Sequence, residues 1–378
     1  MSQPLGTRNL VSRNLVSRRL DGWLVGWLAV IVWFAVVLAD HAGLRLGSGL
    51  AAAVYWVGAV VSASHFGLSY HLAYSDGLPA LRRRPVALVL GPALLVVVLA
   101  SIVGISLAVG PTSAARVTSA LITSVYLMTA WHYVKQVYGI GRVGAAFRGV
   151  RLTPTHVRVL RYGLYPLCFI GAAQVLVIGR NYRLAGYQVG FGVLPYEVLP
   201  WLRGLAALAA IGVGVTFVAL RRSSGAWPPA LLVAPYAAAF LWLGLAPSPV
   251  WTILLLAPFH ALQYLAVGHR AELAVAAGRP GTHGAAWWLN VFGGAACGGL
   301  LVSRWLPQSL DAHVDRAGPL LFAAAFFVFL NLHHYLIDAV IWRSSGELVR
   351  AIVRRPGSAA PAAPATPSGQ PVAGLLTS

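Results

Sequence analysis

Acidic side chains are scarce in this sequence of 378 residues. Only nine aspartates and glutamates are present, and charged residues of both signs make up 10% of the chain, whereas apolar residues make up 58%. A soluble domain carries roughly a quarter charged residues, so a water-soluble globule of this composition could not bury its apolar surface. Disordered chains are poor in apolar residues, which excludes that class as well. The composition predicts an integral membrane protein.

Cysteine and lysine are also scarce, with Cys168, Cys297 and Lys135 as their only representatives. Both cysteines fall in apolar stretches, which argues against a disulfide framework or a thiolate zinc site. Arginine is abundant by contrast, and the net charge is +19. A basic surface can bind nucleic acid, but arginines beside membrane spans set orientation, and no polar domain remains to hold a nucleic acid. We therefore expect no nucleic-acid partner.

Ten apolar segments approach the roughly 20 residues that a membrane-crossing helix needs. They are 22–39, 50–73, 86–109, 117–140, 159–179, 201–220, 229–245, 250–268, 287–304 and 318–342. The sequence thus predicts an all-α, polytopic transmembrane helix bundle of about ten spans. This domain comprises residues 22–343, between a basic N-terminal segment (1–21) and a C-terminal tail (344–378) that is first basic and then disordered.

The arginines predict how the spans are oriented. With the N-terminus inside, 20 of the 27 arginines fall on the cytoplasmic side, as the positive-inside rule requires. Both termini are then cytoplasmic, and we expect the protein in the inner membrane of a bacterium.

The histidines concentrate on four of the predicted helices. Three of them lie ten residues before a cytoplasmic arginine, in the pairs His132 and Arg142, His260 and Arg270, and His333 and Arg343. At 1.5 Å per residue, they would lie at one depth, roughly 15 Å from the basic boundary. Polar groups at such depth are costly and mark functional sites. Because unrelated packing histidines would not share a depth, we expect one common site.

Neutral imidazole is the commonest metal ligand, so the common site is a candidate metal site. The predicted ligands are His65, His132, His260, His333 and His334. Candidates for additional ligands, or for partners that orient the ligands, lie on the same helices: His71, Gln136, Gln263 and Asp338. A ligand set of imidazoles with few carboxylates suits iron, with one or two ions, and also copper or zinc; a haem held by axial histidines is a further alternative.

Three segments resemble motifs of the Brp/Blh family of β-carotene dioxygenases, which are polytopic enzymes with histidine-bound iron. They are Ser64-His65-Phe66-Gly67, Phe259-His260 with Gln263, and His334-Tyr-Leu-Ile-Asp338 followed by Arg343. The resemblance implies that His65, His260 and His334 are iron ligands. It does not extend to that family's early His-Gly-x-x-Asp element, for which Asp40-His41-Ala42-Gly43 is a poor match. Membrane di-iron desaturases and hydroxylases are similar in character only, because their HxxxH and HxxHH boxes are absent.

A metal site within the bilayer can be reached by acyl chains and isoprenoids that enter sideways. Oxidation of their unactivated bonds needs a metal and oxygen. We therefore expect a non-haem iron oxygenase that acts on a lipid or on an isoprenoid or carotenoid-like substrate, with an electron donor as a further partner if the reaction requires one. Two alternatives stay open: a haem-binding electron-transfer protein, and a metal or proton transporter.

Overall fold

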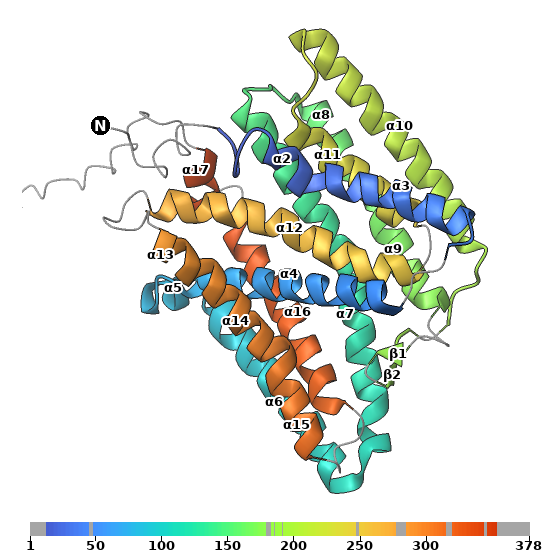
Figure 1. Cartoon of the computed structure of the whole chain (residues 1–378), viewed down its shortest axis with the longest axis vertical. Helices are drawn as coiled ribbons and strands as arrows, with labels where there is room; N and C mark the ends of the chain where they lie inside the picture. Colours follow the sequence, from blue (N-terminus) through green and yellow to red (C-terminus); the bar gives the residue numbers. More distant parts are fainter. Residues whose placement is uncertain are drawn as a thin grey trace, which may run out of the picture.

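The computed structural model of the chain describes residues 13–44, 48–178, 183–184, 186–190, 192–246, 249–276, 285–314, 320–343 and 346–353. Helices make up nearly all of the regular structure in these ranges (Figure 1), which confirms the prediction of an all-α protein. Most of the predicted N-terminal basic segment and most of the predicted C-terminal tail lie outside the described residues.

The first half of the chain contains α2 (Leu20–Gly22), η1 (Trp23–Trp27), α3 (Leu28–His41), α4 (Ser48–Tyr74), α5 (Leu78–Arg83), η2 (Val86–Leu90), α6 (Gly91–Val109), α7 (Pro111–Phe147), α8 (Pro154–Tyr162) and α9 (Tyr165–Ile178). The second half contains α10 (Val198–Ser224), α11 (Ala230–Ala239), η3 (Phe240–Gly244), α12 (Pro249–Ala276), α13 (Ala285–Trp288), η4 (Leu289–Gly293), α14 (Gly294–Leu300), η5 (Leu301–Trp305), α15 (Leu306–His313), α16 (Leu321–Ile341) and α17 (Glu347–Val353). The η elements are single π-helical turns that adjoin α-helices.

Between α9 and α10 lies a two-stranded antiparallel hairpin of β1 (Arg183–Leu184) and β2 (Tyr187–Gln188). Arg183 pairs with Gln188, and Leu184 pairs with Tyr187. The hairpin is tied to α7 just beyond β2, where the backbone N–H of Gly190 donates to Thr123 Oγ1 at 2.8 Å.

Seven helical segments in the described part of the chain are long and apolar enough to cross a membrane. They are Leu20–His41, Gly49–Tyr74, Val86–Val109, Pro154–Val177, Val198–Ser224, Ala285–His313 and Leu321–Ile341. These helices give the chain the character of an integral membrane protein. The sequence predicts ten spans, and the three others coincide with helices as well: 117–140 lies in α7, 250–268 lies in α12, and 229–245 forms the shorter apolar helix Ala230–Gly244.

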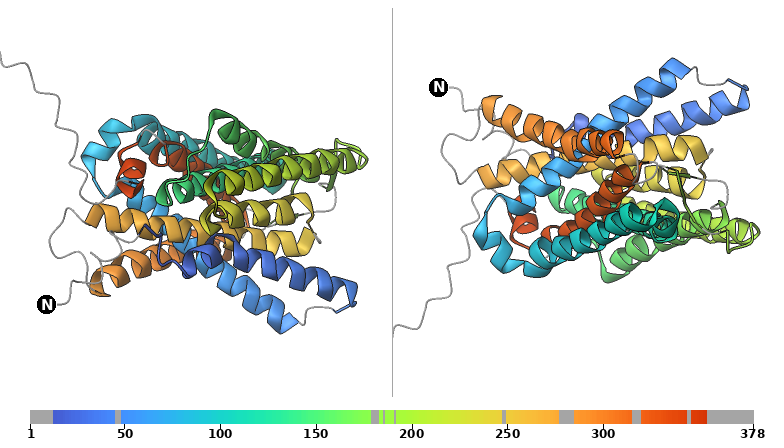
Figure 2. Two further views of the ribbon diagram at one scale, coloured as in Figure 1. Left: turned by 90° about the horizontal axis from the view of Figure 1, so that it is seen from above. Right: turned by 90° about the horizontal axis from the view of Figure 1, so that it is seen from below.

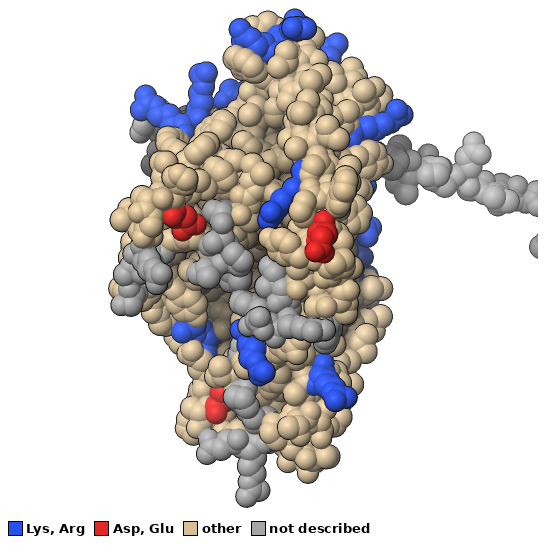
Figure 3. Space-filling view, turned by 90° about the vertical axis from the view of Figure 1, so that its right-hand side faces the viewer, with Lys and Arg blue, Asp and Glu red and all other residues tan. Residues whose placement is uncertain are grey.

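The surface of the molecule is largely apolar. Large hydrophobic side chains are exposed on several helices, among them Leu94, Trp201 and Leu208, and most of the face shown in Figure 3 carries no charge. Water would not tolerate contiguous apolar surface of this extent, whereas acyl chains would cover it.

Four helices position the histidines. α4 and α12 lie side by side, and α7 and α16 cross them at a steep inclination (Figure 1), while the remaining helices flank this group (Figure 2). The interior between α7, α9, α10 and α11 is filled by aliphatic residues and Tyr236, whereas the crossing of α4, α7, α12 and α16 contains polar side chains.

Glycines let α14 approach α4 at backbone distance. A Cβ atom at Gly67 would overlap the carbonyl group of Ala295, and one at Gly299 would overlap that of Ala63. Only glycine fits such a contact between two helix backbones. Gly67 follows His65 by two residues on α4, so this contact positions the helix close to its buried histidine.

Candidate metal centre

One histidine from each of the four crossing helices reaches a common point in the interior. His65 of α4, His132 of α7, His260 of α12 and His334 of α16 are each at most 6% exposed. The Nε2 atoms of His65 and His334 lie 3.0 Å apart, those of His132 and His260 lie 3.2 Å apart, and those of His132 and His334 also lie 3.2 Å apart. Residues that are up to 269 positions apart in the sequence thus direct the same ring nitrogen at one another.

These separations match the spacing of ligands around one metal ion. A metal–imidazole bond of roughly 2.0–2.1 Å places two ligand nitrogens about 2.9 Å apart at a right angle and about 3.4 Å apart at the tetrahedral angle. The observed Nε2 distances of 3.0 and 3.2 Å fall between these values. Two overlapping groups could hold a metal ion, each with ligand atoms within 4.8 Å: His65, His260 and His334, and His132, His334 and Asp338.

Hydrogen bonds at Nδ1 orient two of the imidazoles. His65 Nδ1 lies 3.3 Å from the carbonyl oxygen of Ser62, and a carbonyl can only accept, so assigning the proton to Nδ1 leaves the Nε2 lone pair free. His334 Nδ1 lies 3.0 Å from Ser69 Oγ, which can accept in the same way. Both Nε2 lone pairs then face each other, an arrangement that a cation between them would stabilise.

Asp338 adds a carboxylate to the cluster. Its Oδ2 atom lies 3.4 Å from His334 Nε2 and 3.6 Å from His132 Nε2. Its Oδ1 atom accepts hydrogen bonds from Tyr264 Oη at 3.3 Å and from Trp342 Nε1 at 3.2 Å. One oxygen is therefore anchored while the other faces the imidazoles. Asp338 follows His334 by four residues, which places both on one face of α16.

The surroundings of His260 combine close packing with one unsatisfied atom. The ring of Tyr133 stacks on the His260 ring with centroids 4.1 Å apart. The Nδ1 atom of His260 is buried without a hydrogen-bond partner among the described residues. A buried polar atom of this kind costs free energy, and a functional role is one explanation for its retention.

Gln136 and Gln263 hold the backbone around the cluster. Gln136 Nε2 donates to the carbonyl oxygen of His260 at 2.9 Å and to Gln263 Oε1 at 3.0 Å. Gln263 Nε2 donates in turn to the carbonyl oxygen of Val25 in η1 at 2.7 Å. The two amides thereby connect α7, α12 and η1.

The structure does not bring His333 or His71 into the cluster. Successive residues of a helix point about 100° apart, so His333 faces away from His334. Its Nδ1 atom lies 2.8 Å from Tyr70 Oη, and its Nε2 atom lies 3.2 Å from the carbonyl oxygen of Ala87. His71 instead faces Glu272, with His71 Nε2 and Glu272 Oε1 3.2 Å apart. The sequence-based assignment of His333 as a ligand therefore has no support in this geometry.

Tyr133 and three further residues of the site escape the sequence-based ligand prediction. The three are Ser69, Tyr264 and Trp342, and each follows a residue of the cluster by four positions: Ser69 follows His65, Tyr264 follows His260 and Trp342 follows Asp338. The i,i+4 spacing places each of them on the same helix face as its predecessor, which is the signal that could have identified them.

Comparisons of the chain with protein-family models, with curated proteins and with solved structures find no match. The similarity to the Brp/Blh enzymes therefore rests on the short motifs alone.

Proposed function

We propose that this chain is a multi-pass membrane enzyme that binds iron through His65, His132, His260 and His334 and oxidises a lipophilic substrate with dioxygen. The observation that carries the proposal is the convergence of four buried imidazole Nε2 atoms at ligand spacing. Imidazoles with one carboxylate suit iron, copper and zinc, and of these iron combines readily with the oxygen chemistry that apolar substrates require.

The residues around the ligands have separate tasks in this proposal. Tyr264 and Trp342 hold the Asp338 carboxylate, whose negative charge offsets part of the charge of a bound cation. Tyr133 and Gln136 hold His260 in place. The apolar helix faces exclude water and favour a substrate that is itself apolar.

Dioxygen can cleave a carbon–carbon double bond without electrons from a further reductant. The C=C bond and the O–O bond break, two C=O bonds form, and both oxygen atoms enter the products, with all electrons supplied by the alkene. A bound iron ion would activate dioxygen for this step. Hydroxylation of a C–H bond would instead need two electrons and two protons from a separate donor.

The topology that accompanies this proposal has ten spans and both termini in the cytoplasm of a bacterial cell. It is supported by the arginine distribution and by helices at all ten predicted positions. In this arrangement α4, α7, α12 and α16 all run from the outside to the inside, and their histidines meet within the bilayer.

The geometry does not favour haem. Two axial imidazoles would need a gap of roughly 4 Å between their Nε2 atoms, with a flat macrocycle in that gap. The observed separations of 3.0 and 3.2 Å are shorter than this gap. No contact of the described residues specifically favours transport.

Elemental analysis of the detergent-purified chain, together with its optical spectrum, tests this proposal. We expect bound iron without the absorption of haem. The variants His132→Ala, His260→Ala and His334→Ala should each lose the metal, because each removes one Nε2 ligand. His333→Ala is the matched control, since it removes the neighbouring imidazole that faces Tyr70 and Ala87.

Retention of the metal in all three ligand variants would show that the cluster is structural. β-Carotene, the substrate of the enzymes that the motifs resemble, is the first probe of the reaction, and ¹⁸O₂ should label both carbonyl products. Bound iron with no turnover of β-carotene or other polyenes would contradict the oxygenase assignment and leave the metal site intact.

A further inference from the structure

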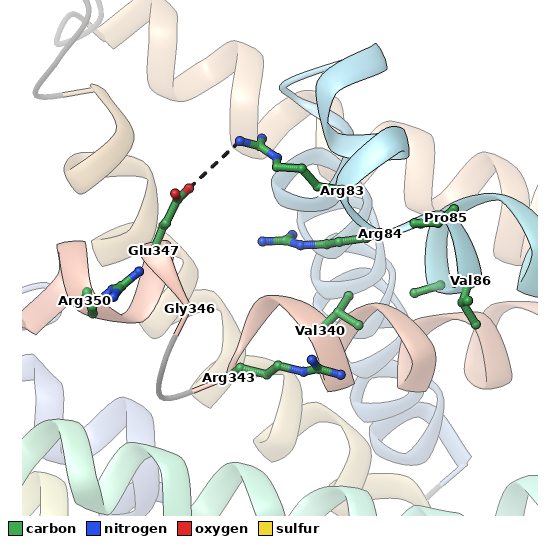
Figure 4. Close-up of a pocket in the computed structure, with 10 residues that line it drawn as sticks. Arg83, Arg84, Pro85, Val86, Val340, Arg343, Gly346, Glu347 and Arg350 are labelled. Carbon is green, nitrogen blue, oxygen red and sulfur yellow. Dashed lines mark ion pairs between the residues drawn. The ribbon is translucent and has the colours of Figure 1, made fainter. Parts of the chain in front are cut away.

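A basic pocket lies where α5, η2, the end of α16 and α17 meet (Figure 4). Its volume is about 420 Å³. Four arginines and one glutamate supply its charged side chains: Arg83, Arg84, Arg343, Arg350 and Glu347. The pocket is separate from the histidine cluster.

The positive charge of this pocket is only partly compensated. Arg83 forms ion pairs with Asp76 at 2.5 Å and with Glu347 at 4.0 Å. In the part of the chain that the structure describes, no carboxylate lies within ion-pair distance of Arg84, Arg343 or Arg350. Burial, together with the neighbouring charge of Arg83, lowers the pKa of Arg84. An anion in the pocket would relieve this repulsion.

The wall of the pocket next to these arginines is apolar and continues onto an exposed face. Pro85, Val86, Ala87 and Val340 line it. Val86 is 67% exposed, and Leu90, one helical turn further along the span Val86–Val109, is 61% exposed. A ligand that carries its charge at one end and hydrocarbon at the other would match both halves of this surface.

We propose that this pocket binds the phosphate group of an anionic membrane lipid, with the acyl chains along the exposed face of Val86 and Leu90. Guanidinium groups bind phosphate oxygens through paired hydrogen bonds, and basic pockets between membrane helices on the cytoplasmic side bind lipid headgroups. Glu347 pairs with Arg83, so Arg84, Arg343 and Arg350 are the arginines of the pocket that can bind the phosphate. This inference does not depend on the metal or on the proposed reaction.

Binding of defined lipids to the full-length, detergent-purified chain tests the inference, with native mass spectrometry as the readout. The probes are dioleoyl phosphatidic acid and dioleoyl phosphatidylcholine. The first should bind more tightly, and Arg84→Gln and Arg350→Gln should each weaken its binding about 5-fold, the equivalent of about 1 kcal/mol per arginine near a membrane surface. Arg350 is exposed, so its variant should fold even if the variant at Arg84 does not.

Arg82→Gln is the matched control, because Arg82 precedes Arg83 directly, carries the same charge and does not line the pocket. Its affinity for phosphatidic acid should stay within 2-fold of the unmodified chain. An equal loss for Arg82→Gln and Arg350→Gln would overturn the proposal in favour of diffuse attraction to the surface. Binding of inorganic phosphate as tight as that of phosphatidic acid would also overturn it, because the acyl chains would then contribute nothing.

Discussion

At the scale of single residues, the ability of the histidine cluster to bind a metal depends on which ring nitrogen of each imidazole faces the other imidazoles. His65 and His334 have Nδ1 partners that direct Nε2 to the centre, whereas the ring nitrogens of His333 already have partners in Tyr70 and Ala87. Two adjacent histidines in the sequence therefore have different surroundings. A pattern of residue types cannot distinguish them, because the difference arises from helices that are distant in the sequence.

Asp338 is the residue whose role can be tested most cleanly. We expect Asp338→Asn to lower metal affinity about 10–100-fold, as loss of a group that orients or supports the ligands does, because the negative charge disappears while Oδ1 can still accept from Tyr264 and Trp342. Competition with a chelator measures the affinity. Glu347→Gln removes a carboxylate that is 80% exposed in its side chain and distant from the imidazoles, so it should leave the affinity unchanged. Equal effects of the two changes would assign Asp338 no part in metal binding.

At the scale of helices, the apolar segments predicted where the helices lie, and the positions of the histidines along them predicted a common site. Helices lie at all ten predicted positions, and one histidine from each of the four predicted histidine-bearing helices reaches a common point. The crossing angles and the π-helical turns could not be predicted in this way, because they depend on which helices touch. Ala87, whose carbonyl binds His333, lies within one such turn.

The close approach of α4 and α14 gives a prediction at this scale. Gly67→Ala should destabilise the protein by about 1–3 kcal/mol, the usual cost of overpacking, because the new Cβ would overlap the backbone of Ala295. Thermal unfolding in detergent measures the effect. Gly104→Ala is the matched control on α6, where a Cβ would meet nothing within 4 Å. An unchanged melting temperature for the variant at Gly67 would mean that the helices do not meet at backbone distance.

At the scale of the whole molecule, the exposed apolar surface and the arginines describe a protein embedded in lipid. The composition alone predicted this class, because 58% apolar residues and nine acids fit no other. The proposed orientation of the spans rests on the count of arginines on each side. The number of crossings depends on α7 and α12, which are long enough but are not among the seven apolar segments, and on α11 with η3, which is shorter.

Reporter fusions measure the orientation directly. Alkaline phosphatase, which is active only outside the cytoplasm, should be inactive when fused after Val353 and active when fused after Val109. The first position follows the last described helix, and the second separates α6 from α7. An active fusion after Val353 would contradict a cytoplasmic C-terminus. Fusion after Ser224, at the end of α10, should again be inactive and serves as an internal control.

The order in which the four histidines occur along the chain has a consequence for biosynthesis. His65, His132, His260 and His334 are translated in that order, and 269 residues separate the first from the last. A ribosome-bound chain that has released α4, α7 and α12 into the membrane still lacks the fourth imidazole and Asp338, which both arrive with α16. The full set of candidate ligands therefore exists only after α16 has been made, and until then the nascent chain carries at most three of the four imidazoles.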